Sequence, residues 1–182
     1  MNRIIKNMEN KYLETSAQFV EDVFTDSEGK ESAGIVKQLV LEIRSKRFYL
    51  PELELIMVDE LDCILGYAMF SRFHLEGKYE NELLLLSPVA VKTELQRQHI
   101  SKDIIEYGFE KAVQMGYQAV LVEGNPQNYR SRGFQTSADF GIMAGKNMSL
   151  PSKECLMVKE LVKGALHHIN GVVDYSDYGF LT

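Results

Sequence analysis

A long apolar stretch in the middle of the chain is the strongest structural signal in the sequence. Residues 83–91 read LLLLSPVAV, which is apolar without alternation and typical of a strand covered on both faces. From Ser101 on, apolar residues recur at helical spacing, and Gly116 stands where a helix would end. We therefore predict a buried strand over 83–91, a helix over 101–115 and, between them, a short polar loop that contains Arg97.

Hydrophobic spacing predicts further helices and strands on both sides of this segment. In chain order we expect a strand at 3–6, helices at 9–24 and 32–47, strands at 53–58 and 64–73 joined by a hairpin turn at 60–62, a polar loop at 75–81, a strand at 119–123, a helical turn at 127–131, short strands that include 155–161, and an irregular tail at 171–182. A right-handed crossover through the helix at 101–115 would place strands 83–91 and 119–123 side by side. The order of elements predicts an α/β (α+β) fold, a mixed sheet with helices on both faces.

Length and composition favour a compact cytoplasmic protein. The 182 residues suit a single domain over 1–182, with a core at about 3–150 and a C-terminal strand and tail at 151–182. The longest apolar runs are shorter than the roughly 18 residues that a membrane span needs, and the opening MNRIIKNMENKYLE lacks the apolar centre of a secretion signal. We therefore expect a cytoplasmic location with no membrane partner. The net charge of −6 argues against a general affinity for nucleic acid.

Cysteine and histidine positions give no sign of a disulfide or a metal site. Cys63 and Cys155 stand in apolar surroundings without C-x-x-C spacing, which favours buried free thiols in a reducing cytoplasm over a disulfide. The histidines show no ligand spacing on a shared helix, so we expect no metal site. They are His74, His99, His167 and His168.

The polar loop after the predicted central strand has the features of an anion site. A strand, a short turn and a helix N-terminus bring free backbone N–H groups and the positive end of the helix dipole together, which suits a phosphate. Lys92, Arg97 and Lys102 lie within eleven residues there, in a chain that is acidic as a whole. An ordinary strand-to-helix connection with a solvated charged face explains the same pattern, so these residues alone leave both readings open.

Three motifs in this order resemble the GNAT superfamily of acyl-CoA-dependent N-acyltransferases, and within it the YhbS-like predicted acetyltransferases. The strand ends in LSPVAV at 86–91, and QRQHIS at 96–101 stands in the place of the Q/R-x-x-G-x-G/A phosphate loop of the family. Residues 124–134, GNPQNYRSRGF, are similar to the G-D/N-P-x-x-Y-x-x-x-G-F segment of the YhbS-like group and form the most specific of the three motifs. The resemblance implies a GNAT-like single domain with a mostly antiparallel sheet of about six to seven strands.

The resemblance also implies acetyl-CoA as cosubstrate and a set of residues that hold it. The N–H groups of 97–101, with Arg97, would bind the pyrophosphate, and the pantetheine arm would pair with the backbone near 89–91, where an N–H at about Val91 would polarise the thioester carbonyl. The expected cofactor-binding residues are Val89, Ala90, Val91, Gln96, Arg97, Gln98, His99, Ile100, Ser101, Asn125 and Asn128.

The expected catalytic residues are Tyr129 and Glu123. Tyr129 matches the tyrosine of the family four residues before Gly-Phe, and a phenol with a pKa of about 10 can protonate a departing thiolate at neutral pH. A tyrosine that only packs against a short helix is the alternative. Glu123 ends a predicted strand and is our candidate general base, with Glu82 a weaker one. A solvated carboxylate, or a water chain without a dedicated base, stays open for both.

The leading function is therefore transfer of an acetyl group from acetyl-CoA to an amine of a small molecule or a protein, by direct attack in a ternary complex.

His99 and Ser101 depart from the small, flexible residues that are usual in the phosphate loop, although histidine is one of the few residues that tolerate positive φ. This departure motivates an alternative, a catalytically weak or inactive GNAT-fold binding or regulatory module with an altered loop. A nucleotide-binding α/β domain of another kind rests on the loop alone. A homodimer is possible by analogy with the family.

Overall fold

In the computed structural model, residues 2–179 are described, and the chain falls into two compact units. The first unit contains Met1–Ser71 and Pro88–Gly108, and the second contains Arg72–Ser87 and Phe109–Thr182. The prediction that 1–182 forms one domain stays a prediction.

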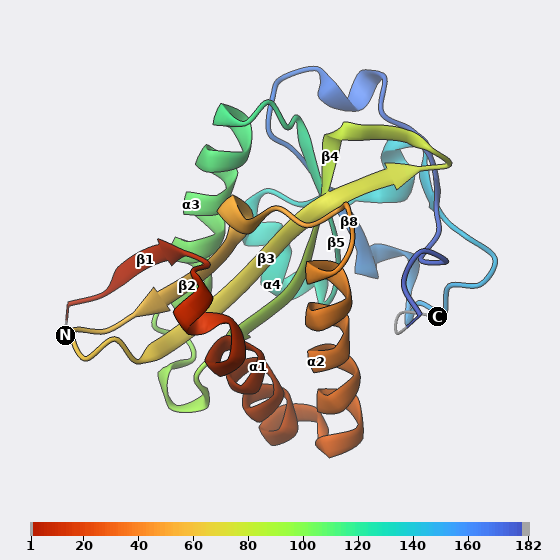
Figure 1. The fold of residues 1–182 in the computed structure, drawn as a ribbon. Helices are drawn as coiled ribbons and strands as arrows, with labels where there is room; N and C mark the ends of the chain where they lie inside the picture. The colour runs from red at the N-terminus through yellow and green to blue at the C-terminus, as the bar shows by residue number, and fades with distance from the viewer. Residues whose placement is uncertain (1, 180–182) are drawn as a thin grey trace. The chain divides into compact units, whose positions relative to one another are not determined.

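The strands form one large mixed sheet and one small parallel sheet (Figure 1). The helices are α1 (Leu13–Glu28), α2 (Lys30–Arg44), α3 (Ile100–Gln114) and α4 (Pro126–Tyr129). The strands are β1 (Ile4–Asn7), β2 (Glu54–Val58), β3 (Ile64–Leu75), β4 (Lys78–Val91), β5 (Ala119–Glu123), β6 (Gln135–Thr136), β7 (Ile142–Ala144), β8 (Leu156–Glu160) and β9 (Gly171–Val173). The large sheet has the order β1-β2-β3-β4-β5-β8-β6, and the small one pairs β7 with β9.

This architecture confirms the predicted fold class. β4 and β5 pair in parallel, as the crossover through α3 requires, whereas β1–β2, β2–β3, β5–β8 and β6–β8 pair antiparallel. The continuous apolar run of β4 explains its central place, because Leu83–Leu86 are all buried.

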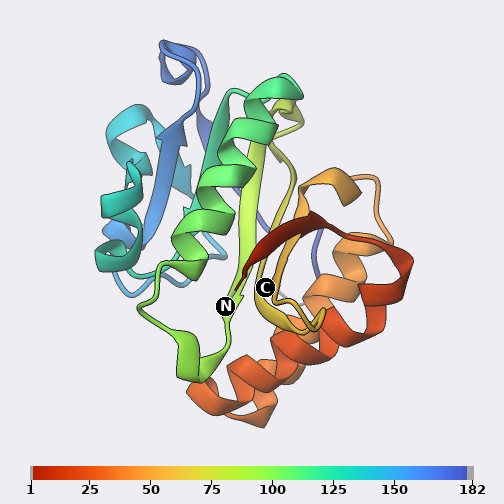
Figure 2. The same cartoon turned by 90° about the vertical axis from the view of Figure 1, so that its left-hand side faces the viewer.

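In the first unit, helices cover both faces of the strands. Adjacent residues of β2 point to opposite faces, so the carboxylate of Glu54 meets Arg44 of α2. The next residue, Leu55, lies on the face of α3, since a Cβ on Gly108 would come within 3.2 Å of its side chain. The same Cβ would lie 2.3 Å from the ring of Phe70, so glycine is what lets α3 approach β3 this closely. Figure 2 shows α1 and α2 next to each other and apart from α3.

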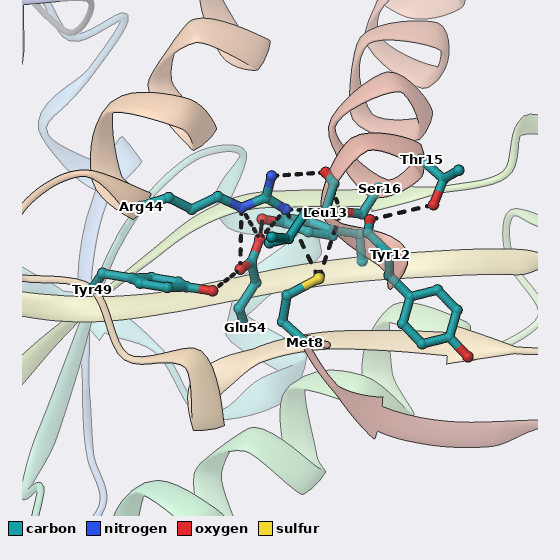
Figure 3. A network of polar contacts seen from close by, with 9 residues as sticks. Met8, Tyr12, Leu13, Thr15, Ser16, Arg44, Tyr49 and Glu54 are labelled. Atoms are coloured by element: carbon teal, nitrogen blue, oxygen red, sulfur yellow. Dashed lines mark hydrogen bonds and ion pairs between the residues drawn. The ribbon is translucent and has the colours of Figure 1, made fainter. Parts of the chain in front are cut away.

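A buried ion pair lies between the paired helices and β2 (Figure 3). Glu54 is fully buried, and its carboxylate accepts hydrogen bonds from Nε and Nη2 of Arg44, the latter at 2.7 Å. The hydroxyls of Tyr49 and Tyr67 donate to the same carboxylate. Burial, together with the charge of Glu54, raises the pKa of Tyr67 well above its usual value, so this phenol stays a donor. Arg44 also donates to the carbonyl of Leu13 at 2.8 Å, which ties α1 into the same network.

In the second unit, the segment after β8 folds back onto the β3–β4 hairpin. Gly171–Val173 form β9, which pairs in parallel with β7. His168 binds Glu82 at 2.6 Å, and His74 binds Asp177 at 2.6 Å. The prediction of an irregular tail at 171–182 was therefore wrong for residues 171–173, whose strand is too short to stand out in the sequence, while residues 180–182 lie outside the described part of the chain.

Three further expectations need correction. The helix predicted at 9–24 runs on to Glu28, because the polar Thr25–Glu28 still form helical turns and only Gly29, at φ 89°, ends them. The loop predicted at 75–81 is the two-residue turn Glu76-Gly77, with φ values of 53° and 82°, so both flanking strands are longer than expected.

Both cysteines are free as predicted, but neither is buried. Cys63 is exposed because it follows the β2–β3 turn, and Cys155 is half-buried.

The ion pair leads to a stability prediction. Replacing Arg44 with leucine leaves the Glu54 carboxylate buried without its counter-charge, so we expect a loss of about 3–5 kcal/mol in the free energy of unfolding. The half-exposed pair of Lys37 and Glu21 is the matched control, and Lys37→Ala should cost at most about 1 kcal/mol. Urea unfolding followed by circular dichroism measures both, and equal losses would contradict this account.

Candidate active site

The hydrogen-bonded ladder between β4 and β5 ends before either strand does. It covers Leu83–Leu85 opposite Ala119–Leu121, while β4 continues to Val91 and β5 to Glu123. From Val122 on, β5 is paired only with β8 on its other side. Within the second unit, the hydrogen-bonded pairing of β4 with β5 therefore stops at Leu85 and Leu121.

The backbone of the last residues of β4 has a free edge in the first unit. The N–H of Lys92 donates to the carbonyl of Leu65 on β3 at 3.0 Å. Neighbouring residues of a strand direct their N–H groups to opposite edges, so the N–H groups of Val91 and Val89 point away from β3. The side chain of Ala90 is buried, whereas Val89 and Val91 are half-buried. The resemblance to the GNAT superfamily predicts that the thioester lies at this edge.

The loop before α3 holds two non-glycine residues in the left-handed region. Arg97 has φ 63° and His99 has φ 64°, so His99 keeps the backbone conformation for which glycine is normally used. The carbonyl of His99 accepts the first helical hydrogen bond of α3, from Asp103 at 2.9 Å. Within the described residues, the N–H groups of Arg97, Gln98 and His99 have no hydrogen-bond acceptor, which leaves them available to an anion.

Two contacts hold this loop in place. The hydroxyl of Thr93 donates to Asp26 in the last turn of α1 at 2.8 Å. The guanidinium of Arg3 donates twice to Gln98, to its side-chain Oε1 at 2.7 Å and to its carbonyl at 3.2 Å. The Gln98 side chain is thus occupied by Arg3. It helps to shape the loop and is not free to contact a ligand through Oε1.

Of Lys92, Arg97 and Lys102, the three cations in and beside the loop in the sequence, Arg97 is the one without an acidic partner among residues 2–179. Lys92 binds Glu94 at 3.0 Å, and Lys102 lies 3.8 Å from Glu106 one helical turn on. The side chains of Arg97 and His99 are exposed and make no hydrogen bond within the described part of the chain. The charge available for an external anion therefore lies on Arg97.

The second group of predicted residues follows β5 in the second unit, where Asn125 begins a short helix. Its side chain accepts a hydrogen bond from the N–H of Gln127 at 3.0 Å, and Pro126 occupies the first helical position. The side-chain oxygen of Asn125 therefore caps the helix, a role that needs no cofactor. The exposed Asn128 side chain has no partner among the described residues.

The ring of Tyr129 is positioned by two features of its own motif. A Cβ on Gly124 would lie 2.7 Å from Cε2 of Tyr129, so the ring lies directly over this glycine. The buried Phe134 meets the ring edge-on, with the centroids 5.6 Å apart. Gly133, at φ 87°, makes the left-handed turn that brings Phe134 back. The spacing of glycine, tyrosine and glycine-phenylalanine therefore reflects the packing around one aromatic ring.

The hydroxyl of Tyr129 carries a proton that no described residue accepts. Burial raises the pKa of Tyr129 above its usual value, although the Arg132 guanidinium, 5.9 Å from the ring centre, works in the opposite direction. The phenol therefore stays protonated at neutral pH. It has no hydrogen-bond partner in the described part of the chain, so its proton is not already committed.

The two candidate bases have different surroundings. Glu123 is exposed at the end of β5, and its Oε2 accepts a hydrogen bond from the hydroxyl of Tyr175 at 3.0 Å. Glu82 is paired with His168 at 2.6 Å, so its carboxylate is engaged elsewhere. Because Glu123 is exposed and Glu82 is held by His168, Glu123 is the better candidate for the general base.

Comparison with known proteins places this fold in a family. The model of the acetyltransferase (GNAT) family matches residues 18–140, which is more than half of the chain.

The chain belongs to the GNAT family.

Individual relatives agree with this assignment. The uncharacterized N-acetyltransferase YhbS of Escherichia coli K12 is 25% identical over 142 residues, which cover 78% of this chain and 81% of that protein. The crystal structure of E. coli YhbS in complex with CoA has a TM-score of 0.80 at 22% identity, and the match covers 96% of this chain and 90% of that one. A GNAT acetyltransferase from Brucella melitensis, solved with acetyl-CoA, has a TM-score of 0.61 at 23% identity and covers 75% and 84% of the two chains. These structures share the fold.

The predicted site residues of this GNAT protein fall into both units: 89–91 and 96–101 in the first, and 123, 125, 128 and 129 in the second. That all of them surround one bound molecule stays a prediction. Sequence reasoning missed Arg3 and Tyr175, which contact Gln98 and Glu123. Neither carried a signal, because Arg3 is one cation near the N-terminus and Tyr175 lay in the presumed tail.

Residues 2–179 of this GNAT protein contain no cluster of three His, Cys, Asp or Glu side chains arranged to hold a metal ion. No helix in the same range has the length and apolarity to cross a membrane. The cytoplasmic location stays a prediction.

The contact between Gly124 and Tyr129 gives a prediction that needs no substrate. Gly124→Ala should lower the free energy of unfolding by about 1–3 kcal/mol, because the new methyl group displaces the ring. In a Tyr129→Ala background the same change should cost little, and a double-mutant cycle from urea unfolding measures the difference. Gly34→Ala in α2, where a Cβ meets nothing within 4 Å, is the control and should not destabilise. Additive effects of the two substitutions would argue against the packing described.

Proposed function

We propose that this GNAT protein transfers the acetyl group of acetyl-CoA to an amine of a small molecule or a protein, by direct attack in a ternary complex. The amine nitrogen attacks the thioester carbonyl carbon, a C–N bond forms and the C–S bond breaks. The thiolate takes a proton from the acid, and the amine loses a proton to the base. The observation that carries the proposal is Tyr129, whose phenol stays protonated and has no partner within the described residues.

The binding of acetyl-CoA is supported by the loop at 97–99 and by two relatives. Three unpaired N–H groups and the guanidinium of Arg97 offer donors and charge for a pyrophosphate. E. coli YhbS was solved with CoA and the Brucella protein with acetyl-CoA, so proteins of this fold take this ligand. In our proposal the residues of this loop hold the diphosphate.

The edge of β4 is suited to the other end of the same molecule. The N–H groups of Val89 and Val91 point away from β3, so an extended amide-containing arm can add to this edge as a strand would. An N–H placed at the thioester oxygen stabilises the charge that develops there, which is worth about 3 kcal/mol in other acyl-transfer sites. We assign this role to Val91.

Tyr129 acts as general acid and Glu123 as general base in this proposal. A protonated phenol can donate to the departing thiolate, and an exposed carboxylate can accept the proton of the attacking amine, directly or through water. The acidic net charge of −6 favours the approach of a cationic amine.

The backbone at His99 favours an active enzyme over a module that has lost its phosphate loop. The alternative function rested on His99 and Ser101 in place of small residues, yet His99 adopts φ 64° and its side chain is exposed. Ser101 is half-buried near the start of α3. A protein that binds acetyl-CoA but acetylates no amine would reverse this preference and support a binding or regulatory module.

Removing the phenol tests the chemistry. Tyr129→Phe should lower kcat by about 10²–10⁴-fold, because the thiolate then leaves without a proton donor. The Kd for acetyl-CoA should change little, since the ring and its packing remain. Release of CoA with a panel of cadaverine, a lysine peptide and a peptide with a free N-terminus measures turnover, and calorimetry measures binding. Unchanged turnover in the variant would exclude Tyr129 as the acid.

Removing the free cation tests the binding site. Arg97→Ala should raise the Kd for acetyl-CoA by about 10–100-fold, because one charge-assisted contact to phosphate is lost. Lys92→Ala is the matched control, since Lys92 is paired with Glu94, and it should raise the Kd by no more than about threefold. Titration calorimetry at low salt compares the two, and equal effects would move the phosphate site away from Arg97.

A further inference from the structure

The C-terminal segment 168–177 brings a phenol to the end of β5. The hydroxyl of Tyr175 donates to Oε2 of Glu123 at 3.0 Å. This is the one hydrogen bond made by the Glu123 side chain within the described part of the chain, so Oε1 has no partner there. Glu123 is exposed, whereas Tyr175 is buried. The contact therefore joins a solvent-accessible carboxylate to a fixed aromatic side chain.

Separate contacts along the C-terminal segment hold Tyr175 in this position. Its ring meets Phe73 of β3 edge-on, with the centroids 6.0 Å apart. On one side of it along the chain, His168 binds Glu82 at 2.6 Å and its carbonyl accepts the hydroxyl of Tyr79 at 2.9 Å. On the other side, Asp177 binds His74 at 2.6 Å. The segment is thus anchored at both ends, and the position of Tyr175 does not depend on Glu123 alone.

The hydroxyl of Tyr175 is a permanent donor. Burial, together with the neighbouring charge of Glu123, raises the pKa of Tyr175 far above its usual value, so the phenol keeps its proton throughout the physiological range. A donor of this kind fixes the orientation of the carboxylate it binds, because it holds one of the two oxygens, here Oε2. The lone pairs of Oε1 stay open to another proton.

We infer that Tyr175 is a positioning residue for the general base: it holds Glu123 by Oε2 and leaves Oε1 to take the proton of the attacking amine. The inference rests on the proposed function, since Glu123 needs to be positioned by Tyr175 only if it is the general base of that reaction. The carboxylate accepts the ammonium proton at Oε1 before attack and passes it to solvent. The second proton, which the nitrogen loses once the C–N bond has formed, goes to Tyr129, whose own proton has gone to the departing thiolate. Tyr175 exchanges no proton.

The test compares an acceptor that must lose a proton before attack with one that need not. Cadaverine is an ammonium ion at pH 7, whereas hydroxylamine is neutral and already nucleophilic. With cadaverine, Glu123→Gln should lower kcat/KM by about 10²-fold. Tyr175→Phe should lower it by about tenfold, because a misoriented base is only partly effective. With hydroxylamine both losses should be much smaller, and the KM for acetyl-CoA should stay within about twofold of the wild type in both variants.

Two further variants separate positioning from support of the fold. Tyr79→Phe removes another tyrosine hydroxyl that anchors the same segment and should leave both activities unchanged. The double variant with Glu123→Gln and Tyr175→Phe should lose no more than Glu123→Gln alone, because Tyr175 works through Glu123. If Tyr175→Phe does not fold, Glu123→Asp serves instead, since it withdraws the carboxylate from the phenol, and the same loss with cadaverine is expected.

The outcomes are distinct. Equal losses with both acceptors, additive effects in the double variant, or an effect of Tyr79→Phe as large as that of Tyr175→Phe would overturn the inference while leaving the enzyme active. A wild-type protein that acetylates neither cadaverine nor hydroxylamine would instead count against the proposed function itself.

Discussion

The buried ion pair of Arg44 and Glu54 is the constraint on which the first unit depends. A carboxylate without contact to water is tolerated only when its charge and its lone pairs are matched, and here one guanidinium and two phenols do so. The four side chains come from α2, β2, β3 and the connection between α2 and β2. Through Leu13 the guanidinium also reaches α1. The register of both helices against the strands is therefore set by hydrogen bonds as well as by apolar packing.

The candidate site depends on the main chain more than on special side chains. The loop presents N–H groups because Arg97 and His99 adopt left-handed conformations, and β4 presents an edge because the N–H groups of Val89 and Val91 point away from β3. The one side chain with a demanding environment is Tyr129, whose ring needs the absence of a Cβ at Gly124. This division explains how a histidine can stand where the family usually has glycine, since the φ angle is kept although the residue type has changed.

Much of the fold was predictable because its central elements are long and strongly patterned. The run LLLLSPVAV is typical of a covered strand, and the crossover to β5 followed from the handedness of such connections. The turn at Glu76-Gly77 was missed because glutamate is uncommon at positive φ, so a tight hairpin looked like a polar loop. Arg3 with Gln98 and Glu123 with Tyr175 join residues 95 and 52 positions apart. No periodicity in one sequence connects such pairs, and only the fold brings them together.

The two hydrogen bonds from Arg3 to Gln98 link the motion of the loop before α3 to that of the N-terminal strand. Arg3 directly precedes β1, a strand of four residues at the edge of the sheet that is hydrogen-bonded on one side only. Short edge strands are among the elements that open at the lowest free energy, long before a domain unfolds. Fraying of β1 therefore releases both hydrogen bonds to Gln98 while the ion pair beneath α1 and α2 stays intact. The rigidity of the loop is tied to the fraying equilibrium of the edge strand, and hydrogen exchange at Ile4–Asn7 reports on both.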